Sequence, residues 1–286
     1  MKRISALILF SLIVLVAIVV VQHISYHDGK LHVIFCDVGQ GDGIIIRTPE
    51  NNIILIYGGP NDKILDCLAS HTAFWERNID LVLLSHTHSD HITGLISVFQ
   101  NYHVEAFATE NVKNKTKTFD ELFGIIAKSN LVVDYLAQGD TIEVQDVQLH
   151  VVGPSKSFLE QNSISGFIPQ SGEFSSLVLF LEYKKTNLLF TGDSQAIGLH
   201  DAMTVFNETI DILQIPHHGS LSGLNQEIID ILKPDIAVIS VGLHNKYNHP
   251  NPFTLSLLNK NFIPIVRTDK LGNIEFVSDG EEWVKK

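Results

Sequence analysis

The stretch from Ile4 to Val21 is an unbroken run of eighteen residues with sixteen apolar side chains, two serines and no charge. As a helix it would be about 27 Å long at about 1.5 Å per residue, close to the roughly 30 Å of a hydrocarbon core. Because the run is apolar all the way round, it lacks the polar face that a surface helix turns to water. It therefore predicts a transmembrane helix, and the globular part of the protein must fold from the residues that follow.

Two basic residues, Lys2 and Arg3, precede the run, and basic flanks favour the cytoplasmic side of a membrane. We expect a single-pass protein of the cell membrane whose folded domain lies outside the cytoplasm. A cleaved signal peptide is the alternative, but its apolar region is usually shorter, and no small-x-small cleavage pattern follows Val21. The predicted organisation is an anchor, or uncleaved signal, over residues 1–27 and one domain over residues 28–286.

The composition of the chain excludes several classes of protein. With 45% hydrophobic residues in 286, the chain is too long and too apolar to be disordered. Its net charge of −12 is too acidic for binding nucleic acid through a broad basic face. Two cysteines, Cys36 and Cys67, are too few for a disulfide scaffold or a four-cysteine zinc site. We expect buried free thiols, with a disulfide as the alternative outside the cytoplasm.

Short runs rich in Val and Ile, bounded by Gly, Asn, Asp and Pro, recur along the chain and are typical of strands. They are Leu31–Cys36, Gly43–Arg47, Ile53–Tyr57, Asp80–Leu84, Val104–Ala108, Leu131–Tyr135, Thr141–Val144, Gln148–Val152, Ser176–Tyr183, Asn187–Thr191, Ile210–Ile215, Ile236–Val241, Ile263–Arg267 and Asn273–Ser278. Helical spacing occurs in Lys63–Arg77, Ile92–Tyr102, Phe119–Ser129, Ser194–Phe206, Asn225–Leu232 and Pro252–Asn261. The order of these elements predicts an α/β fold in which two sheets pack together with helices outside, and a loop at Ser155–Glu173.

Histidines are frequent, at 14 residues, and several of them follow predicted strands. The buried strand predicted at Asp80–Leu84 is followed at once by the sequence SHTHSDH. His86 and His88 project to the same side of an extended segment, and Asp90 and His91 follow at the turn into a helix. Three imidazoles and one carboxylate within six residues suit zinc, which takes nitrogen and oxygen ligands at about 2.0–2.2 Å.

Three further segments place histidine or aspartate after a predicted strand or before a helix. An apolar run ends in Gly-Asp at Asp193, which on its own would most often be a helix N-cap. The segment PHHGS contains His217 and His218, and the segment YNHP contains His249. Converging strand ends would gather these residues on one rim. The four segments together therefore indicate a common site far more specifically than any one of them does.

The order HxHxDH, GD and HHGS resembles the metallo-β-lactamase superfamily. The flanking motifs resemble more narrowly the metallo-hydrolase domain of ComEC-like competence proteins. They are DVGQGD at Asp37–Asp42, GGP at Gly58–Pro60, then HTHSDH, TGD, PHHGS, YNHP and RTD at Arg267–Asp269. The resemblance covers about Leu31 to Gly280 and implies a four-layer αββα metallo-β-lactamase sandwich, here preceded by one transmembrane helix.

The resemblance also implies a site with two divalent metal ions, Zn²⁺ first and Mn²⁺ as the alternative. The metal ligands would be His86, His88, Asp90, His91, Asp193 and His218, with Asp193 bridging the two ions. Such a pair would lower the pKa of a bridging water, generate hydroxide at neutral pH and clamp the phosphoryl oxygens. Catalytic roles fall to Asp90, which would also shuttle a proton, and to His217 and His249, which would stabilise or protonate the leaving oxygen.

The chain departs from the family pattern at two places. Where many members carry a further His, or ComEC-like domains an Asn-x-x-Ser pattern, this chain reads EFSS from Glu173 to Ser176. Glu173 would supply an oxygen ligand or be an exposed loop acid, and a weaker position of this kind favours Mn²⁺ or Fe²⁺. The second departure is Tyr57, where the family has an Asp that supports the metal-ligand loop. These two departures from the family pattern leave open the alternative that the domain is catalytically impaired.

The leading hypothesis is a metal-dependent hydrolase, a phosphodiesterase or nuclease acting outside the cytoplasm. Only the resemblance points to phosphodiesters, and the substrate would be DNA or a phosphoester of wall polymer or lipid. The acidic charge does not exclude such substrates, since two metal ions bring about four positive charges to the site. The alternative is a non-catalytic or impaired metal-binding accessory domain in DNA uptake, and β-lactam hydrolysis is a third, minor hypothesis. The sequence does not indicate an oligomeric state.

Overall fold

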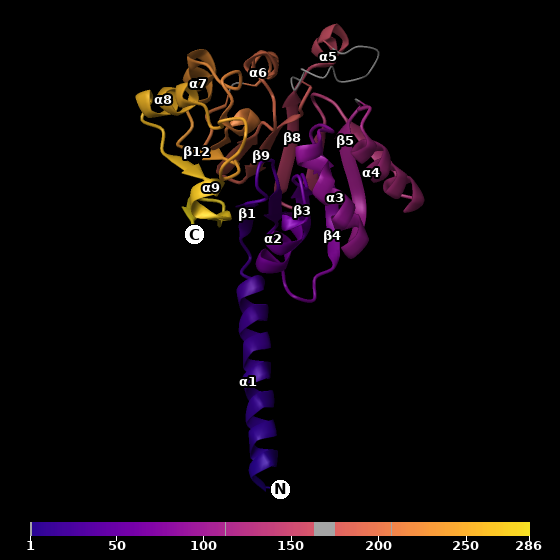
Figure 1. The fold of residues 1–286 in the computed structure, drawn as a ribbon. Helices are drawn as coiled ribbons and strands as arrows, with labels where there is room; N and C mark the ends of the chain where they lie inside the picture. Colours follow the sequence, from indigo (N-terminus) through magenta and orange to yellow (C-terminus); the bar gives the residue numbers. More distant parts are fainter. Residues whose placement is uncertain (1, 112, 163–174, 207) are drawn as a thin grey trace.

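The computed structural model describes residues 2–111, 113–162, 175–206 and 208–286. One helix, α1 (Lys2–Tyr26), stands away from the folded body that the other elements form (Figure 1). The stretch Leu7–Tyr26 is long and apolar enough to cross a membrane, and its most apolar window is not buried against the rest of the protein. The predicted apolar helix is therefore present as a candidate membrane span.

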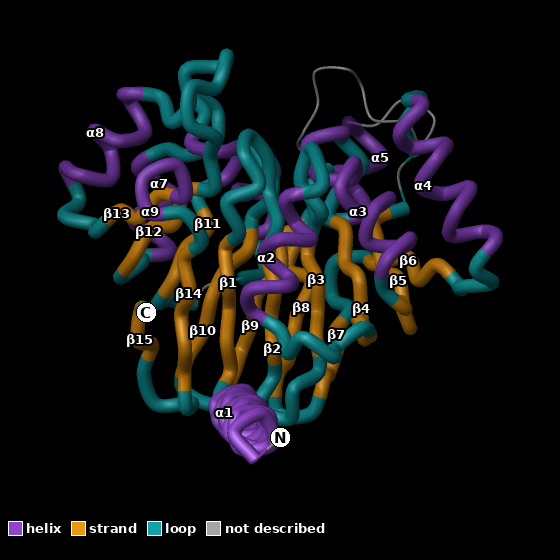
Figure 2. The backbone as a smooth tube through the Cα atoms, turned by 60° about the horizontal axis from the view of Figure 1, so that its bottom comes forward, coloured by secondary structure: helices purple, strands orange, loops and turns teal. Residues whose placement is uncertain are grey.

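The folded body consists of two sheets packed face to face, with helices on both outer sides (Figure 2). In the described part of the chain the sheet orders are β15-β14-β1-β2-β3-β4-β5-β6 and β13-β12-β11-β10-β9-β8-β7. The first sheet contains β1 (Leu31–Phe35), β2 (Ile44–Arg47), β3 (Ile53–Ile56), β4 (Asn78–Leu84), β5 (His103–Glu110), β6 (Val133–Leu136), β14 (Ile274–Ser278) and β15 (Trp283–Lys285). The second contains β7 (Thr141–Val144), β8 (Val147–Gly153), β9 (Val178–Tyr183), β10 (Thr186–Phe190), β11 (Ile212–Gln214), β12 (Ile236–Ile239) and β13 (Ile265–Arg267). The predicted αββα sandwich is confirmed.

Each sheet contains a block of parallel strands, β3 to β6 in one sheet and β10 to β13 in the other. Parallel strands need crossover helices, which cover the outer faces of the sheets. The helices of the first half are α2 (Lys63–His71), α3 (Ser89–Asn101) and α4 (Lys117–Lys128), and those of the second are α6 (Ala196–Ala202), α7 (Gln226–Leu232) and α8 (Pro252–Lys260). Within each block the carboxyl ends of the strands therefore lie at one edge of the sheet.

Strand β10 shows how the layers are held together. Leu188 and Phe190 point into the core between the two sheets, whereas Leu189 belongs to a second core beneath α6, α7 and α8. Because successive side chains of a strand alternate between the faces of a sheet, a strand covered on both sides must be apolar throughout. The continuous apolar runs of the sequence are the consequence.

Several elements differ from the prediction at their ends. The helix predicted at Lys63–Arg77 ends at His71, because the Thr72 hydroxyl donates to the carbonyl of Leu68 and the backbone of Thr72 is extended. A short helix, α5 (Lys156–Asn162), occupies the start of the loop predicted at Ser155–Glu173, and the Ser155 hydroxyl accepts a hydrogen bond from its first turn. The rest of that loop lies outside the described residues. The sequence analysis also missed β15 and the short helix α9 (Thr268–Leu271).

The expectation of free thiols is wrong, because Cys36 and Cys67 form a disulfide with their Cα atoms 5.9 Å apart. Cys36 directly follows β1, and Cys67 lies on the buried side of α2. Both residues are almost completely buried. Local sequence patterns could not reveal the bond, since the two thiols meet only after α2 has packed across the end of β1.

Replacing both cysteines with alanine should lower the free energy of unfolding by about 3–4 kcal/mol. The crosslink joins residues 31 positions apart and so restricts the unfolded chain. Urea unfolding of the full-length protein in detergent measures the difference, and wild-type protein treated with a reductant should behave like the variant. Two titratable thiols in the untreated wild-type protein would contradict the disulfide.

Candidate metal centre

The residues predicted as metal ligands lie where strands of both sheets end. β4 leads into the loop before α3 and then into the first turn of that helix. β10 leads into a Gly-Asp turn, and β11 leads into the short 3₁₀ helix η1 (Pro216–Gly219). These strand ends meet at one edge of the sandwich and bring together six side chains: His86, His88, Asp90, His91, Asp193 and His218.

The first group of side chains consists of His86, His88 and Asp193, each of which offers one ligand atom within 4.8 Å of the others. His86 Nε2 lies 3.6 Å from Asp193 Oδ2, and the rings of the two histidines meet edge to face with their centroids 4.8 Å apart. The group therefore presents two imidazoles and one carboxylate to a common point.

The second group consists of Asp90, His91, Asp193 and His218, again with one ligand atom each within 4.8 Å of the others. His91 Nε2 lies 3.3 Å from Asp193 Oδ2, and His218 Nε2 lies 3.6 Å from Asp193 Oδ1 and 3.6 Å from Asp90 Oδ2. Asp193 thus belongs to both groups and turns one oxygen toward His86 and His91 and the other toward His218.

Four buried ligand atoms have no hydrogen-bond partner within the described ranges: His86 Nε2, His91 Nε2, His218 Nε2 and Asp193 Oδ1. Buried polar atoms are nearly always paired, because leaving one unpaired costs about 1–3 kcal/mol. Imidazole nitrogens with carboxylate oxygens are a donor set that Zn²⁺ takes readily and that Mn²⁺ accepts in part. The residues present therefore fit a divalent ion in each group. The N-cap reading of Asp193 does not hold, because the N-cap of α6 is Gln195.

The two histidines of η1 have strained backbones that send their side chains in different directions. The φ angles of His217 and His218 are 49° and 54°, in the left-handed region that residues other than glycine seldom adopt. His218 is buried and its Nδ1 lies 3.0 Å from the carbonyl oxygen of Ser240. His217 is 19% exposed, and its Nε2 lies 3.9 Å from Asp193 Oδ2. Strain of this kind is typical of functional sites.

His249 lies at the rim of the centre beside His217, with 5.5 Å between the two ring centroids. Its backbone is fixed by Asn245, whose side chain accepts from the amide of His249 at 3.0 Å and donates to its carbonyl at 2.7 Å. The structure thus brings the two predicted rim histidines together, next to the ligand groups rather than within them.

Ser176, the last residue of the EFSS segment, links the ligands of the first group. Its hydroxyl lies 2.8 Å from Ser85 Oγ and 3.3 Å from His86 Nδ1, and it accepts a hydrogen bond from the amide of Asp193. Ser85 Oγ lies 3.1 Å from the same His86 nitrogen. The two hydroxyls therefore orient the ring so that Nε2 faces Asp193. Glu173, the candidate oxygen ligand, lies outside the described residues.

Tyr57, which stands where the family pattern has Asp, is completely buried behind the centre. Its ring packs edge-on against His91 at 4.9 Å between centroids. Gly192 is required beside it, because a Cβ there would lie 2.6 Å from the Tyr57 hydroxyl and 2.3 Å from Ser176 Oγ. Tyr57 therefore supports His91 through ring packing.

Two buried acids near the centre were missed by the sequence analysis. Asp42 lies between the outer nitrogens of two candidate ligands, with Oδ2 3.8 Å from His91 Nδ1 and Oδ1 3.6 Å from His218 Nδ1. Carboxylates in this position hold ligand imidazoles in the orientation that a metal needs. The available signal was the position of Asp42 at the end of DVGQGD. The other acid, Glu110, ends β5, and burial raises its pKa well above the usual range.

Electrostatic coupling within the centre separates the pKa values of its groups. Burial lowers the pKa of both His91 and His218, but the nearby carboxylates, Asp193 foremost, outweigh burial and raise the two values to about 9 and about 10. Burial raises the pKa of Asp193, but the same two histidines hold it well below the usual range. Burial, with the neighbouring His91, lowers the pKa of His86 to about 4. At neutral pH the metal-free centre therefore holds two imidazolium ions beside ionised Asp193.

The family model described as "Beta-lactamase superfamily domain" matches residues 64–218, more than half of the chain, and the match includes all six candidate ligands. The chain belongs to this superfamily. The membership agrees with the HxHxDH, GD and HHGS order, and it confirms the metallo-β-lactamase resemblance.

This superfamily member is 26% identical over 269 residues to ComE operon protein 3 of Bacillus subtilis, covering 87% of this chain and 33% of that protein. It is 24% identical over 244 residues to competence protein ComA of Neisseria gonorrhoeae, covering 84% and 31%. It thus spans about a third of the length of these relatives. Among solved structures it resembles the metallo-β-lactamase fold protein YhfI of B. subtilis, with a TM-score of 0.59 and 10% identity over 87% of this chain and 100% of that one. The resemblance to ComEC-like competence proteins is confirmed.

Because Asp193 belongs to both groups, Asp193→Ala should abolish binding of both ions, whereas His88→Ala and Asp90→Ala should each abolish one. Metal content per chain, measured by mass spectrometry of purified protein loaded with Zn²⁺, distinguishes these cases. His103→Ala, an exposed histidine at the start of β5, is the matched control and should keep both ions. Two retained equivalents in Asp193→Ala would show that the shared carboxylate does not bind them.

Metal affinity should rise steeply with pH. Binding at Nε2 of His91 and His218 displaces a proton from each group that is protonated, because their pKa values are about 9 and about 10. Up to about pH 9 the affinity should therefore grow by about tenfold per pH unit for each proton displaced, or about a hundredfold for two. Calorimetry of Zn²⁺ binding in buffers of different ionisation enthalpy counts the protons, and a count of zero at pH 7 would contradict the coupling.

The same raised pKa values affect the stability of the metal-free protein. Protonated His91 and His218 bind the carboxylates only in the folded state. Their contribution to the free energy of unfolding is therefore complete below about pH 6.5, the ordinary pKa of histidine. It is then lost as the pH rises through about 9 to 10.

Proposed function

We propose that this chain is a membrane-anchored, metal-dependent phosphodiesterase that acts outside the cytoplasm. The observation that carries the proposal is the membership of Asp193 in two adjoining groups of candidate ligands. Two divalent ions that share one carboxylate form a compact pair, the arrangement that phosphoryl-transfer enzymes use to hold both the attacking and the leaving oxygen of a phosphoester.

The candidate ligands would hold one ion between His86, His88 and Asp193, and the other between Asp90, His91, Asp193 and His218. The donor set favours Zn²⁺, with Mn²⁺ as the alternative. When bound, such ions supply Lewis acidity and a lowered pKa of water. Ser85, Ser176 and Asp42 keep the ligand imidazoles oriented, so little reorganisation is needed when an ion enters.

The side chains at the mouth of the centre would handle protons and phosphoryl oxygens. Asp90 Oδ2 lies 3.6 Å from His218 Nε2 at the open side of the second group, where it can hold an ion and pass on a proton. His217 and His249 lie beside each other at the rim. From there one can contact a phosphoryl oxygen while the other protonates the leaving oxygen, a contribution typically of about 10²–10⁴-fold.

The proposed substrate class rests on the metal-site chemistry and on the similarity to a competence protein. DNA is the phosphodiester that the similarity to a competence protein favours, and a phosphoester of wall polymer or lipid is the alternative. The net charge of −12 makes a broad electrostatic grip on DNA unfavourable, so the ions and the rim histidines would have to supply the local positive charge. A short stretch or an end of a strand fits that requirement better than a long duplex.

Two observations support the extracytoplasmic location. Lys2 and Arg3 precede the apolar span, which favours a cytoplasmic N-terminus and a domain on the other side. The Cys36–Cys67 disulfide is of a kind that persists in oxidising compartments and is rare in the cytoplasm.

Purified full-length protein in detergent should hydrolyse bis-p-nitrophenyl phosphate and nick plasmid DNA when supplied with Zn²⁺ or Mn²⁺. His86→Ala and Asp193→Ala should abolish both activities, and His249→Ala should lower kcat by about 10²–10⁴-fold with its metal content unchanged. His103→Ala is again the control, and circular dichroism confirms that each variant is folded. Activity that survives in Asp193→Ala would exclude this centre as its source.

The second candidate function is a non-catalytic metal-binding accessory domain in DNA uptake, and the observation that favours it is Tyr57. Tyr57 places an aromatic ring against His91 where the family resemblance places a carboxylate, so the centre can bind ions and yet lack one of the groups that would tune them. About two equivalents of metal without turnover of either substrate would establish this function. Gain of turnover in Tyr57→Asp would identify the missing carboxylate as the cause.

A further inference from the structure

The end of α1 is fixed to the folded body without a flexible linker. Tyr26, its last residue, is buried, and its carbonyl accepts a hydrogen bond from the Arg47 guanidinium, which also lies 4.7 Å from the centroid of the Tyr26 ring. Asp28, two residues further, lies 3.8 Å from Arg47 and 3.0 Å from His32 Nε2. The direction of α1 relative to the sheets is therefore set by these contacts, and the face of the body beside α1 must lie at the bilayer surface when α1 spans the membrane.

The loop between α2 and β4 lies on this face and carries two exposed aromatic residues. Phe74 is 61% exposed and Trp75 is 40% exposed, and their rings meet edge to face with 4.7 Å between centroids. The Trp75 ring is 6.1 Å from the ring of His23 in the last turns of α1. In Figure 1 this loop is at the end of the body from which α1 departs. Adjacent exposed aromatic side chains are unusual on a surface that faces only water.

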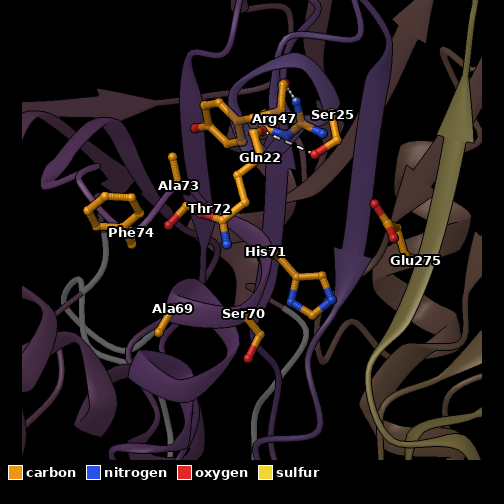
Figure 3. Close-up of a pocket in the computed structure, with 11 residues that line it drawn as sticks. Gln22, Ser25, Arg47, Ala69, Ser70, His71, Thr72, Ala73, Phe74 and Glu275 are labelled. Atoms are coloured by element: carbon orange, nitrogen blue, oxygen red, sulfur yellow. Dashed lines mark hydrogen bonds between the residues drawn. The ribbon is translucent and has the colours of Figure 1, made fainter. Parts of the chain in front are cut away.

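A polar pocket between α1 and this loop marks the depth at which the loop lies. The pocket has a volume of about 290 Å³, and Gln22 and Ser25 of α1 line it together with Ser70, His71 and other residues of the α2 end (Figure 3). Phe74 lines the same pocket. Polar groups at this level belong among lipid headgroups, whereas the ten residues directly before Gln22, from Leu12 to Val21, are all apolar. Phe74 and Trp75 therefore lie at the boundary between headgroups and hydrocarbon, the depth that tryptophan prefers.

We propose that Phe74 and Trp75 insert into the lipid interface and form a second membrane contact of this protein. The inference rests on the membrane anchoring proposed above. A single span can still tilt in the bilayer and rotate about its own axis, and the rigidly joined body would move with it, whereas a second contact beside the span fixes the orientation of the body on the bilayer. The occupant of this surface is lipid, because it is continuous with the only candidate span in the described residues.

This orientation turns the metal centre away from the membrane. β4 begins at Asn78, directly after the aromatic loop, and ends at Leu84, two residues before His86. The six steps along the strand from Asn78 to Leu84, at about 3.3 Å each, separate the two ends by about 20 Å. β1 likewise runs from the foot of α1 toward the DVGQGD loop that reaches His91 and His218. The centre therefore faces the aqueous side, where a polymer such as DNA is accessible and a headgroup of the same bilayer is not.

Tryptophan fluorescence tests the proposal, because the chain has two tryptophans, Trp75 and Trp283. In Trp283→Phe the remaining reporter is Trp75. The matched control carries Trp75→Phe, Trp283→Phe and Phe253→Trp, and so reports from an exposed position on α8, at the metal-centre end of the body. Both full-length variants are reconstituted into phosphatidylcholine vesicles that contain lipid brominated near the headgroup, and iodide is added to the outer solution.

Trp75 should emit at shorter wavelength than the control, should lose at least about half of its intensity to the brominated lipid, and should resist iodide. The tryptophan at position 253 should show the reverse. Resistance of the protein to carbonate extraction is measured in parallel. Protein that resists extraction while Trp75 is quenched by iodide and not by bromine would overturn the second contact and leave the anchor intact. Protein that carbonate extracts would overturn both the anchor and the contact.

Discussion

The buried carboxylate of Asp193 is the group on which the centre depends. Its two oxygens lie within 3.6 Å of Nε2 of three imidazoles, on His86, His91 and His218. An isolated carboxylate at such depth is strongly unfavourable, so positive charge or hydrogen-bond donors must surround it. Those imidazoles come from the end of β4, from α3 and from η1. The two sheets must therefore pack in one relative position for the carboxylate to be stable.

The residues around Asp193 fix the orientation of the three imidazoles that face it. Ser85 and Ser176 fix the ring of His86, and Asp42 faces the outer nitrogens of His91 and His218. Each of these groups lies at Nδ1 of its imidazole, on the side turned away from Asp193, so the Nε2 atom of each ring points toward Asp193. Behind the centre the buried Tyr57 packs its ring against His91 and supplies bulk rather than charge.

The same scaffold joins the centre to the end of the body that carries α1. β1 begins near the foot of α1 and is followed directly by Cys36, which the disulfide ties to α2. α2 in turn leads into the Phe74–Trp75 loop, and β4 returns from that loop to the ligands. Rigid strands covered on both faces by apolar layers transmit a fixed orientation from one end of the body to the other. The position of the centre relative to α1 is therefore a property of the fold.

The sequence by itself determined the apolar span through local composition and the two-sheet class through the order of its elements. It placed His86, His88, Asp90 and His91 directly after a predicted strand, and it indicated Asp193 and His218 through the resemblance to the superfamily. It did not reveal the Cys36–Cys67 bond, the placement of Asp42, or the buried position of Glu110. Nor did it indicate that Trp75 would lie beside α1, at the end opposite His86. These features depend on contacts between segments far apart in the chain, and such contacts are decided only when the apolar faces of both sheets and all their helices are buried together.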